Sequence, residues 1–213
     1  LVRKGREEEL EVIDTLKVWE VVPLQECWDA TGSEPISLRW LDVNKGDDEN
    51  IEMRCRLVAR ELKAYQLRDD VFSATPPMIA VLFLLSLAMT LDIPGVAIGV
   101  VLKLMFLDIS RAYFHAPSTR PIYVQLPPER WIAGFCARLL KSLYGTRDAG
   151  ANFQKLVIQI LELLEFIVGV FSPCIARHKT RFLIIVHYGD DFVVLGGQID
   201  LDWFFESLSK HLI

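Results

Sequence analysis

The alternation of apolar and polar positions divides the chain into helix-like and strand-like stretches. In residues 149–167 the apolar side chains recur every three or four positions, which predicts a helix packed on a sheet. Residues 52–62 alternate instead, as a half-exposed strand does, and residues 37–43 are the expected hairpin partner across the polar segment 44–50. Further helices are predicted near residues 8–19, from Pro76-Pro77 to about Leu91, and from Asp200, a suitable N-cap, to Leu212.

Short apolar runs bounded by turn residues predict the other strands. These runs cover residues 102–109, 122–126, 175–177, 181–187 and 192–195. Strands and helices are therefore intermixed without strict alternation, which favours an α+β fold over a doubly wound parallel sheet.

The most apolar region, residues 78–107, is long enough to raise the question of a membrane span. Five residues that suit a bilayer core poorly interrupt it: Asp92, Pro94, Gly95, Gly99 and Lys103. We expect a buried helix, then a break, then a strand, and no membrane partner.

Composition and charge narrow the class of protein. With 213 residues, of which 52% are hydrophobic and 24% charged, the chain can build one sizeable core or two small lobes. Residues 1–50 hold 6 Lys and Arg against 13 Asp and Glu, so the acidity lies at the front of the chain. A net charge of −5 argues weakly against a dedicated nucleic-acid-binding protein, whose surface is usually basic, but leaves room for a local basic patch.

The cysteines and histidines signal neither a zinc site nor a disulfide framework. Cys27, Cys55, Cys136 and Cys174 are far apart, and none of the four histidines has metal spacing. Reduced thiols in an intracellular protein are the default expectation. The chain begins at Leu1 without a signal-peptide pattern, so we expect an internal fragment of a longer protein.

Two predicted strands end at carboxylates in an apolar setting, Leu104-Met-Phe-Leu-Asp108 and Ile184-Ile-Val-His-Tyr-Gly-Asp190-Asp191. Crowded like charges repel each other and are costly to desolvate, so they need a compensating cation. Magnesium takes oxygen ligands from carboxylates and substrate phosphates, and pairs of such ions assist in-line displacement at phosphorus. Taken alone, Gly189-Asp-Asp is more often an ordinary turn, which Gly and Asp both favour.

Six segments spread over residues 38–197 have a distinctive order and spacing. They are Arg54-Cys-Arg-Leu-Val-Ala-Arg60, Val71-Phe-Ser73, Phe106-Leu-Asp-Ile-Ser-Arg-Ala-Tyr-Phe-His115, Ile122-Tyr-Val-Gln-Leu-Pro-Pro-Glu129, Ala137-Arg-Leu-Leu-Lys-Ser-Leu-Tyr-Gly145 and Tyr188-Gly-Asp-Asp191. Together they resemble the reverse transcriptase domain of the Pol polyprotein of copia-type LTR retrotransposons.

The resemblance implies a right-hand polymerase fold in which an antiparallel palm sheet packs on helices. Residues 36–97 and 118–150 would be fingers-like, residues 98–117 and 151–213 palm-like, and residues 1–35 an acidic lead-in. The thumb is expected to be absent, because no thumb, RNase H or integrase pattern fits into the residues after Asp200.

The implied activity is RNA-directed DNA synthesis on a primed RNA or DNA template, from deoxynucleoside triphosphates, with two Mg²⁺ ions or Mn²⁺. Partners would include the RNase H and integrase domains of the polyprotein. The location would be intracellular, in a cytoplasmic virus-like particle or the nucleus.

Site residues carry over from the resemblance position by position. Asp108, Asp190 and Asp191 would be the catalytic metal ligands, with Asp191 the least certain. Tyr113 would be the aromatic gate that rejects a ribose 2′-hydroxyl. Of the basic positions, Arg56 is the first choice for a triphosphate contact. The remaining substrate-binding positions would be Arg54, Tyr144 and Arg147.

Four departures from the family pattern qualify these expectations. Gly189 stands where the family commonly has Val, and Ser172-Pro-Cys174 where it usually shows Asp-Pro-Cys. Thr146-Arg-Asp-Ala-Gly150 replaces a typical Leu-Lys-Gln-Ala-Pro, and Asp148 would place negative charge near an incoming triphosphate unless it turns outward. Residues 92–102 look like an apolar insertion, either a lineage-specific loop or a decayed reading frame.

Two other functions compete with polymerisation. The chain could be a catalytically decayed remnant that keeps the fold and at most binds nucleic acid. A phosphatase or nuclease could also use clustered carboxylates on two metals, but it would not predict Tyr113 or the arginine-bearing ribbon.

Overall fold

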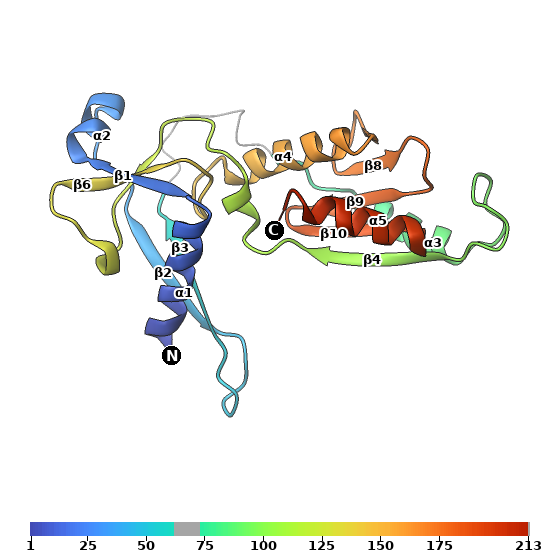
Figure 1. Cartoon of the computed structure of the whole chain (residues 1–213), viewed down its shortest axis with the longest axis horizontal. Coiled ribbons are helices and arrows are strands. Elements are labelled where there is room, and N and C mark those ends of the chain that lie inside the picture. The colour runs from blue at the N-terminus through green and yellow to red at the C-terminus, as the bar shows by residue number, and fades with distance from the viewer. Residues whose placement is uncertain (62–72, 213) are drawn as a thin grey trace. The chain divides into compact units, whose positions relative to one another are not determined.

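The computed structural model describes residues 1–61 and 73–212, which form two compact units (Figure 1). Unit 1 comprises Leu1–Phe72 and Tyr113–Phe153, and unit 2 comprises Ser73–Ala112 and Gln154–Ile213. Each unit combines helices with antiparallel sheet, so the α+β expectation is confirmed. Residues 73–97, expected among the fingers-like segments, belong to unit 2. Val71 and Phe72, quoted above in a motif, lie outside the described residues.

Unit 1 begins with the segment expected to be an acidic lead-in. This segment forms α1 (Val2–Thr15), β1 (Trp19–Pro23) and α2 (Leu24–Thr31). Leu10 and Ile13 of α1 are fully buried in the core of the unit. The helix expected at residues 8–19 thus starts earlier than predicted. It also ends earlier, because Lys17 takes a φ of +51° and Trp19 opens a strand.

Two antiparallel sheets complete unit 1. In the first, β1 pairs with β6 (Phe135–Leu139), which pairs with β5 (Tyr123–Val124). The second is the predicted hairpin of β2 (Leu38–Asn44) and β3 (Met53–Ala59). The inward face of this hairpin carries Cys55, Leu57 and Ala59, whereas Arg54 and Arg56 lie on the other face, as alternation along a strand requires.

The sheet of unit 2 has five antiparallel strands in the order β4-β10-β9-β8-β7. The strands are β4 (Leu102–Asp108), β7 (Phe166–Val168), β8 (Ile175–His178), β9 (Ile184–Tyr188) and β10 (Asp191–Gly197). Four of these five strands correspond to predicted segments, and β7 is an addition. The short 3₁₀ helices η2 (Ala112–His115) and η3 (Pro128–Arg130) follow β4 and β5 in the chain.

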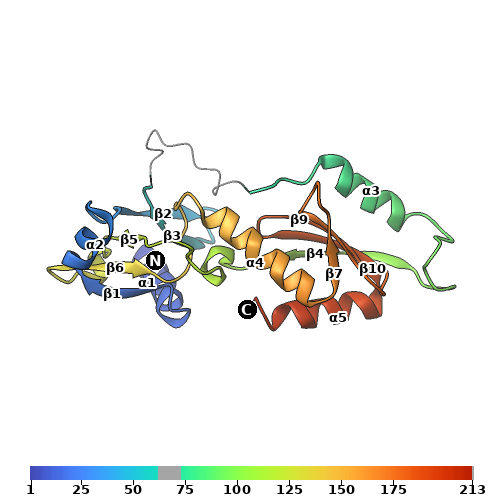
Figure 2. The same cartoon turned by 90° about the horizontal axis from the view of Figure 1, so that it is seen from above.

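Helices cover both faces of this sheet (Figure 2). On one face, α3 (Met78–Ala88) packs through Ala80 and Leu84 on Leu102, Val186 and Leu195. On the other face lies α5 (Gln198–Ser209), whose buried side chains include Leu201, Phe204 and Leu208. The long helix α4 (Ala149–Leu163) starts in unit 1 and ends in unit 2.

Two details of the helices differ from expectation. The helix expected to be buried, α3, is buried on one side only, and Met78, Ile79, Leu82 and Phe83 are exposed. Asp200 does not cap α5, which begins at Gln198 after Gly197; its carboxylate instead accepts a hydrogen bond of 2.6 Å from Arg181. Within residues 1–61 and 73–212, no helix has the length and apolar character needed to cross a bilayer.

Candidate functional site

The two carboxylate-bearing strand ends meet at one edge of the unit 2 sheet. In the antiparallel ladder between β4 and β10, Asp191 is the direct Cα partner of Asp108. Directly opposed residues share one face of a sheet, with Cβ atoms about 4.5–5.5 Å apart. Both aspartates are exposed. Residues more than 80 positions apart in the sequence therefore present their carboxylates on one face.

Asp190 lies in the tight turn that joins β9 to β10. Tyr188 pairs with Asp191, so the turn has two central residues, Gly189 and Asp190. Gly189 has a φ of +58°, which glycine adopts without the steric penalty of a side chain, and the predicted bend at this residue is confirmed. The N–H of Ile109 donates to the carbonyl of Asp190 at 3.0 Å, so the turn is tied to the residue after Asp108.

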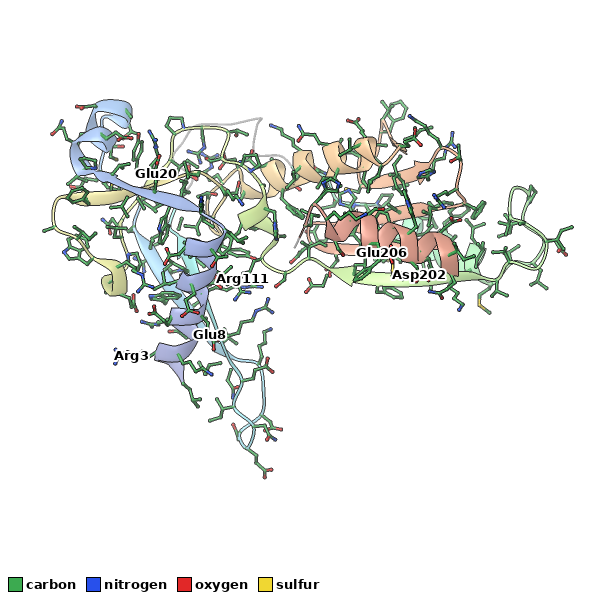
Figure 3. The ribbon with its side chains drawn as sticks, in the orientation of Figure 1. Arg3, Glu8, Glu20, Arg111, Asp202 and Glu206 are labelled. Atoms are coloured by element: carbon green, nitrogen blue, oxygen red, sulfur yellow. The ribbon has the colours of Figure 1, made fainter. Side chains whose placement is uncertain are left out.

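The backbone leaving this edge is in a restricted conformation. Arg111, labelled in Figure 3, has a φ of +50°, which is uncommon for a residue other than glycine. It lies between Asp108 and Tyr113 in the chain. Such conformations cost free energy and persist where surrounding structure imposes them.

The opposite face of the hairpin is packed in the core. His187 and Phe192 are cross-strand partners whose rings stack with centroids 5.2 Å apart, and both are nearly inaccessible. Neither ring nitrogen of His187 makes a hydrogen bond of ordinary geometry within the described part of the chain. Burial therefore lowers the pKa of His187 to about 4, only partly opposed by the carbonyl of Pro173. The uncharged ring of His187 is therefore part of the packing on the face opposite the carboxylates.

The donor atoms of this edge suit a hard divalent cation. Asp108, Asp190 and Asp191 offer only carboxylate oxygens, which are the ligands that Mg²⁺ and Mn²⁺ prefer. Across residues 1–61 and 73–212, however, no three acidic, histidine or cysteine side chains converge closely enough to hold a metal ion. The backbone thus brings the three residues to one edge, while their side chains do not form a finished three-ligand cage.

The aromatic candidates gather in unit 1, around Tyr144. The ring of Tyr113 lies 4.9 Å from that of Tyr144, and the Phe114 ring lies 5.3 Å from it on centroids. The guanidinium of Arg56 lies 5.1 Å above the Tyr144 ring, a cation–π arrangement. Two residues expected to bind substrate, Arg56 and Tyr113, therefore both contact a third, Tyr144.

The other two candidates occupy neighbouring positions. Arg54 is exposed on the same face of the hairpin as Arg56, opposite Val43. Arg147 is half-buried, and its backbone N–H donates to Glu61 at 2.7 Å. Both belong to segments that also carry the cluster around Tyr144.

Close backbone contact joins these segments. The N–H of Ala59, at the end of β3, donates to the carbonyl of Tyr144 at 2.7 Å. Gly145 has a φ of +83°, and a Cβ atom added there would lie 2.1 Å from the carbonyl oxygen of Ala59. Only glycine allows the two segments to approach this closely.

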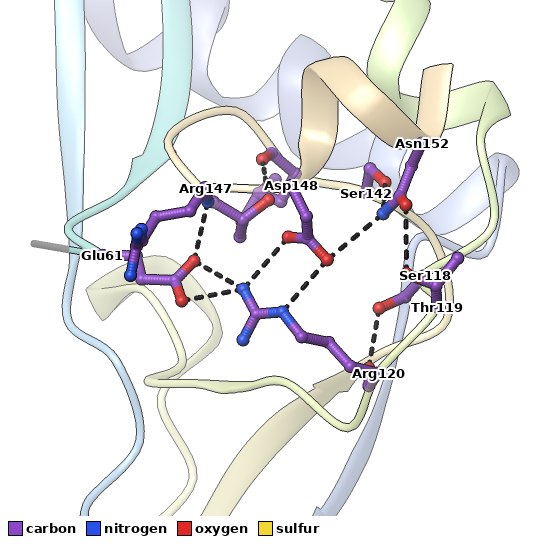
Figure 4. Close-up of polar contacts among 10 residues, drawn as sticks. Glu61, Ser118, Thr119, Arg120, Ser142, Arg147, Asp148 and Asn152 are labelled. Carbon is purple, nitrogen blue, oxygen red and sulfur yellow. Dashed lines mark hydrogen bonds and ion pairs between the residues drawn. The ribbon is translucent and has the colours of Figure 1, made fainter. Parts of the chain in front are cut away.

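Asp148, expected to disturb triphosphate binding, is withdrawn from the surface. It is 1% exposed, and Arg120 donates to both of its carboxylate oxygens at 3.0 Å (Figure 4). Asn152 donates to the same carboxylate at 3.3 Å. The negative charge that departs from the family pattern at this position is thus neutralised by an arginine 28 residues away.

Several residues of this region are not among those expected from the sequence. Arg120 also donates to both carboxylate oxygens of Glu61 at 2.7 Å, and Phe153 contacts the Tyr113 ring. Phe153 belongs to the helical pattern of residues 149–167 and could have been found there. Arg120 and Glu61 follow no local pattern, because their partners are distant in the sequence.

Comparison with known proteins assigns the family. Residues 16–212 match the model of the family described as reverse transcriptase (RNA-dependent DNA polymerase). The chain is also 26% identical over 203 residues to the "Retrovirus-related Pol polyprotein from transposon TNT 1-94" of Nicotiana tabacum. That alignment covers 91% of this chain but only 14% of the tobacco polyprotein. The chain therefore belongs to the reverse transcriptase family and is a reverse transcriptase domain of the copia type.

Proposed function

We propose that the chain is the catalytic domain of an RNA-directed DNA polymerase that extends a primer on an RNA or DNA template. The observation that carries the proposal is the cross-strand pairing of Asp108 with Asp191, next to a turn that carries Asp190. Family membership supports the same reaction, and the tobacco relative is a Pol polyprotein.

The carboxylates would act at the transferred phosphate. Asp108, Asp190 and Asp191 would hold divalent cations, which when bound stabilise the attacking and leaving oxygens of an in-line displacement. Asp191 is the residue opposed to Asp108 in the ladder, so it is as strong a candidate for a shared ligand as Asp190. The stacked pair of His187 and Phe192 would keep the hairpin rigid beneath them.

The cluster around Tyr144 would bind the incoming nucleotide. The guanidinium of Arg56 would grip the triphosphate through paired N–H donors, while the Tyr144 ring holds its orientation. Tyr113, packed on Tyr144 and Phe153, would present a rigid ring that excludes a ribose 2′-hydroxyl. Only five positions separate it from Asp108 in the chain.

One observation favours a second candidate, a remnant that binds nucleic acid without catalysis. No three-ligand metal cage is formed by the side chains of the described residues. Against decay, Arg120 neutralises Asp148, and every carboxylate that the reaction needs is present.

Primer extension separates the two candidates. The chain would be incubated with a 5′-labelled primer on RNA or DNA template, deoxynucleotides and Mg²⁺, with a chelator in a parallel sample. We expect added nucleotides only when free Mg²⁺ is present. Template binding without any extension, across a range of Mg²⁺ and Mn²⁺ concentrations, would favour the remnant; template cleavage would favour a nuclease.

A further inference from the structure

Glu61, Arg120 and Asp148 form a connected ion network inside unit 1 (Figure 4). One guanidinium nitrogen of Arg120, Nη2, donates to both oxygens of Glu61 at 2.7 Å and to Asp148 at 3.0 Å, while Nε donates to Asp148 at 3.0 Å. The side chains of Arg120 and Glu61 are 21% and 14% exposed, and that of Asp148 only 1%. We name these three residues the ionic latch.

The latch is extended by neutral hydrogen bonds that fix its members. Asn152 bridges Asp148 and Ser142, and it accepts a hydrogen bond of 3.0 Å from Thr119. The hydroxyl of Ser118 donates to the carbonyl of Arg120 at 2.9 Å. Side-chain bonds therefore hold both the backbone of Arg120 and the buried carboxylate of Asp148 in place.

The three residues of the latch come from three segments, and each segment carries a candidate nucleotide contact. Glu61 lies two residues beyond β3, the strand of Arg54 and Arg56. Arg120 follows η2, which contains Tyr113. Asp148 ends the loop of Tyr144 and Arg147, and Glu61 also accepts the backbone N–H of Arg147 at 2.7 Å. The latch thus fastens together the segments that bear the candidate pocket.

Arg120 is not available as a phosphate ligand. It faces two carboxylates, and their hydrogen bonds raise its pKa against the effect of burial, so the guanidinium remains charged and committed to them. A buried carboxylate such as Asp148 is stable only while its partner remains. The network is suited to holding backbone segments rather than to binding substrate.

We propose that Glu61, Arg120 and Asp148 are positioning residues, which hold Arg56, Tyr113 and Tyr144 in the arrangement that binds the incoming nucleotide. The expected effect on nucleotide binding rests on the proposed function, whereas the role of the three residues in holding the backbone segments together does not. It assigns a role to Asp148, whose negative charge otherwise looks harmful beside a triphosphate. Misplacing binding groups by as little as about 1 Å can cost on the order of 100-fold in catalysis.

The structural part is tested by amide hydrogen exchange on the full chain. Two amides report on the fastened segments: that of Ala59, bonded to Tyr144, and that of Arg147, bonded to Glu61. In Arg120→Met we expect both to exchange about 10- to 100-fold faster. The amide of Leu139, bonded to Ile122 in the same unit, should keep its protection. Unchanged exchange at Ala59 and Arg147 would overturn the proposal.

A double variant separates positioning from general stability. Arg120→Met leaves the charge of Asp148 buried without its partner, whereas Arg120→Met with Asp148→Asn removes that charge. We expect the double variant to recover much of the lost resistance to urea but not the slow exchange at Arg147, since Glu61 has still lost Arg120. Recovery of both would mean that the latch only stabilises the fold, and the proposal would fail.

The functional part is tested by steady-state primer extension. Arg120→Met and the double variant should raise the KM for deoxynucleotides about tenfold while kcat falls by less than about threefold. Arg130→Met is the matched control, because Arg130 pairs with Glu7 at 2.6 Å in the same unit but lies on none of the three segments. Altered exchange with an unchanged KM would refute the positioning role. A wild-type chain that does not extend primers would instead refute the proposed function, and exchange alone would then decide whether the latch fastens the segments.

Discussion

Asp108 and Asp191 are direct partners across the β4–β10 ladder, although 83 positions separate them in the sequence. A one-residue slip of register would move one carboxylate to the opposite face of the sheet. Phe192 and Val194 on β10 oppose that slip, because both are fully buried on the other face. The apolar packing of the sheet therefore determines where the carboxylates lie, and the same strands that form the core position the candidate chemistry.

Gly145 should tolerate a side chain less well than Gly134 does. Gly145→Ala puts a Cβ atom 2.1 Å from the Ala59 carbonyl oxygen, whereas Gly134, with a similar φ of +79°, has nothing within 4 Å of an added Cβ. The backbone penalty of about 1–2 kcal/mol should be common to both substitutions, and overpacking adds about 1–3 kcal/mol at Gly145 only. Urea unfolding of both variants measures the difference; equal losses of stability would contradict the close approach.

His187 should make the protein less stable in mild acid. Its pKa is about 4 when folded and about 6.5 when unfolded, so the unfolded chain binds the extra proton between these values. The stabilisation is complete above pH 6.5 and falls by about 3 kcal/mol as the pH drops to 4. His187→Leu should flatten this part of the curve of unfolding free energy against pH. His211→Leu, at an exposed position, is the control and should follow the wild type; a parallel curve for His187→Leu would show that the ring titrates normally.

Arg56 should contribute more to nucleotide binding than Arg54 does. Both lie on one face of the β2–β3 hairpin, but only Arg56 is held over the Tyr144 ring. Losing charge-assisted hydrogen bonds worth about 1.5–3 kcal/mol should raise the KM for deoxynucleotides about 10- to 100-fold in Arg56→Ala. The rise in Arg54→Ala should be about threefold or less. The reverse order in steady-state kinetics would move the triphosphate contact to Arg54.

Tyr113 should control the choice between the two sugars. Shortening the side chain in Tyr113→Val removes the ring that packs on Tyr144, and incorporation of ribonucleotides relative to deoxynucleotides should rise about tenfold or more. Tyr113→Phe keeps the ring and should discriminate as the wild type does. The ratio of kcat/KM values for the two nucleotides measures this effect. An unchanged ratio in Tyr113→Val would assign discrimination to another residue.

Strong local periodicity was sufficient to predict much of the fold. The alternation around Arg54 and Arg56, the helical spacing from Ala149 and the apolar strands beside Asp108 and Asp190 all correspond to observed elements. The bend at Gly189 was also predictable, because positive φ favours glycine. The strands β1, β6 and β7 were not predicted; each has five residues or fewer, and their pairing partners are distant in the sequence or lie across a turn.

Long-range pairing accounts for the remaining differences. Asp148 looks like unfavourable charge until Arg120, distant in the sequence, is seen to pair with it. Asp200 has the residue type and position of a helix cap, yet its carboxylate bonds Arg181 instead. In α3 almost every position is apolar, so no contrast in the sequence marks the one side that is buried. Local sequence patterns do not predict these contacts, because the contacts depend on residues that are distant in the sequence.

The central claim is that the carboxylates at the β4–β10 edge form the catalytic centre, and matched substitutions test it most directly. Asp108→Asn and Asp190→Asn each remove one charge from that edge, whereas Asp202→Asn makes the same change on the exposed surface of α5 (Figure 3). In Mg²⁺-dependent primer extension we expect the first two variants to lose essentially all activity and Asp202→Asn to retain it. Extension by Asp108→Asn or Asp190→Asn at the wild-type rate would contradict the assignment of this edge as the catalytic centre.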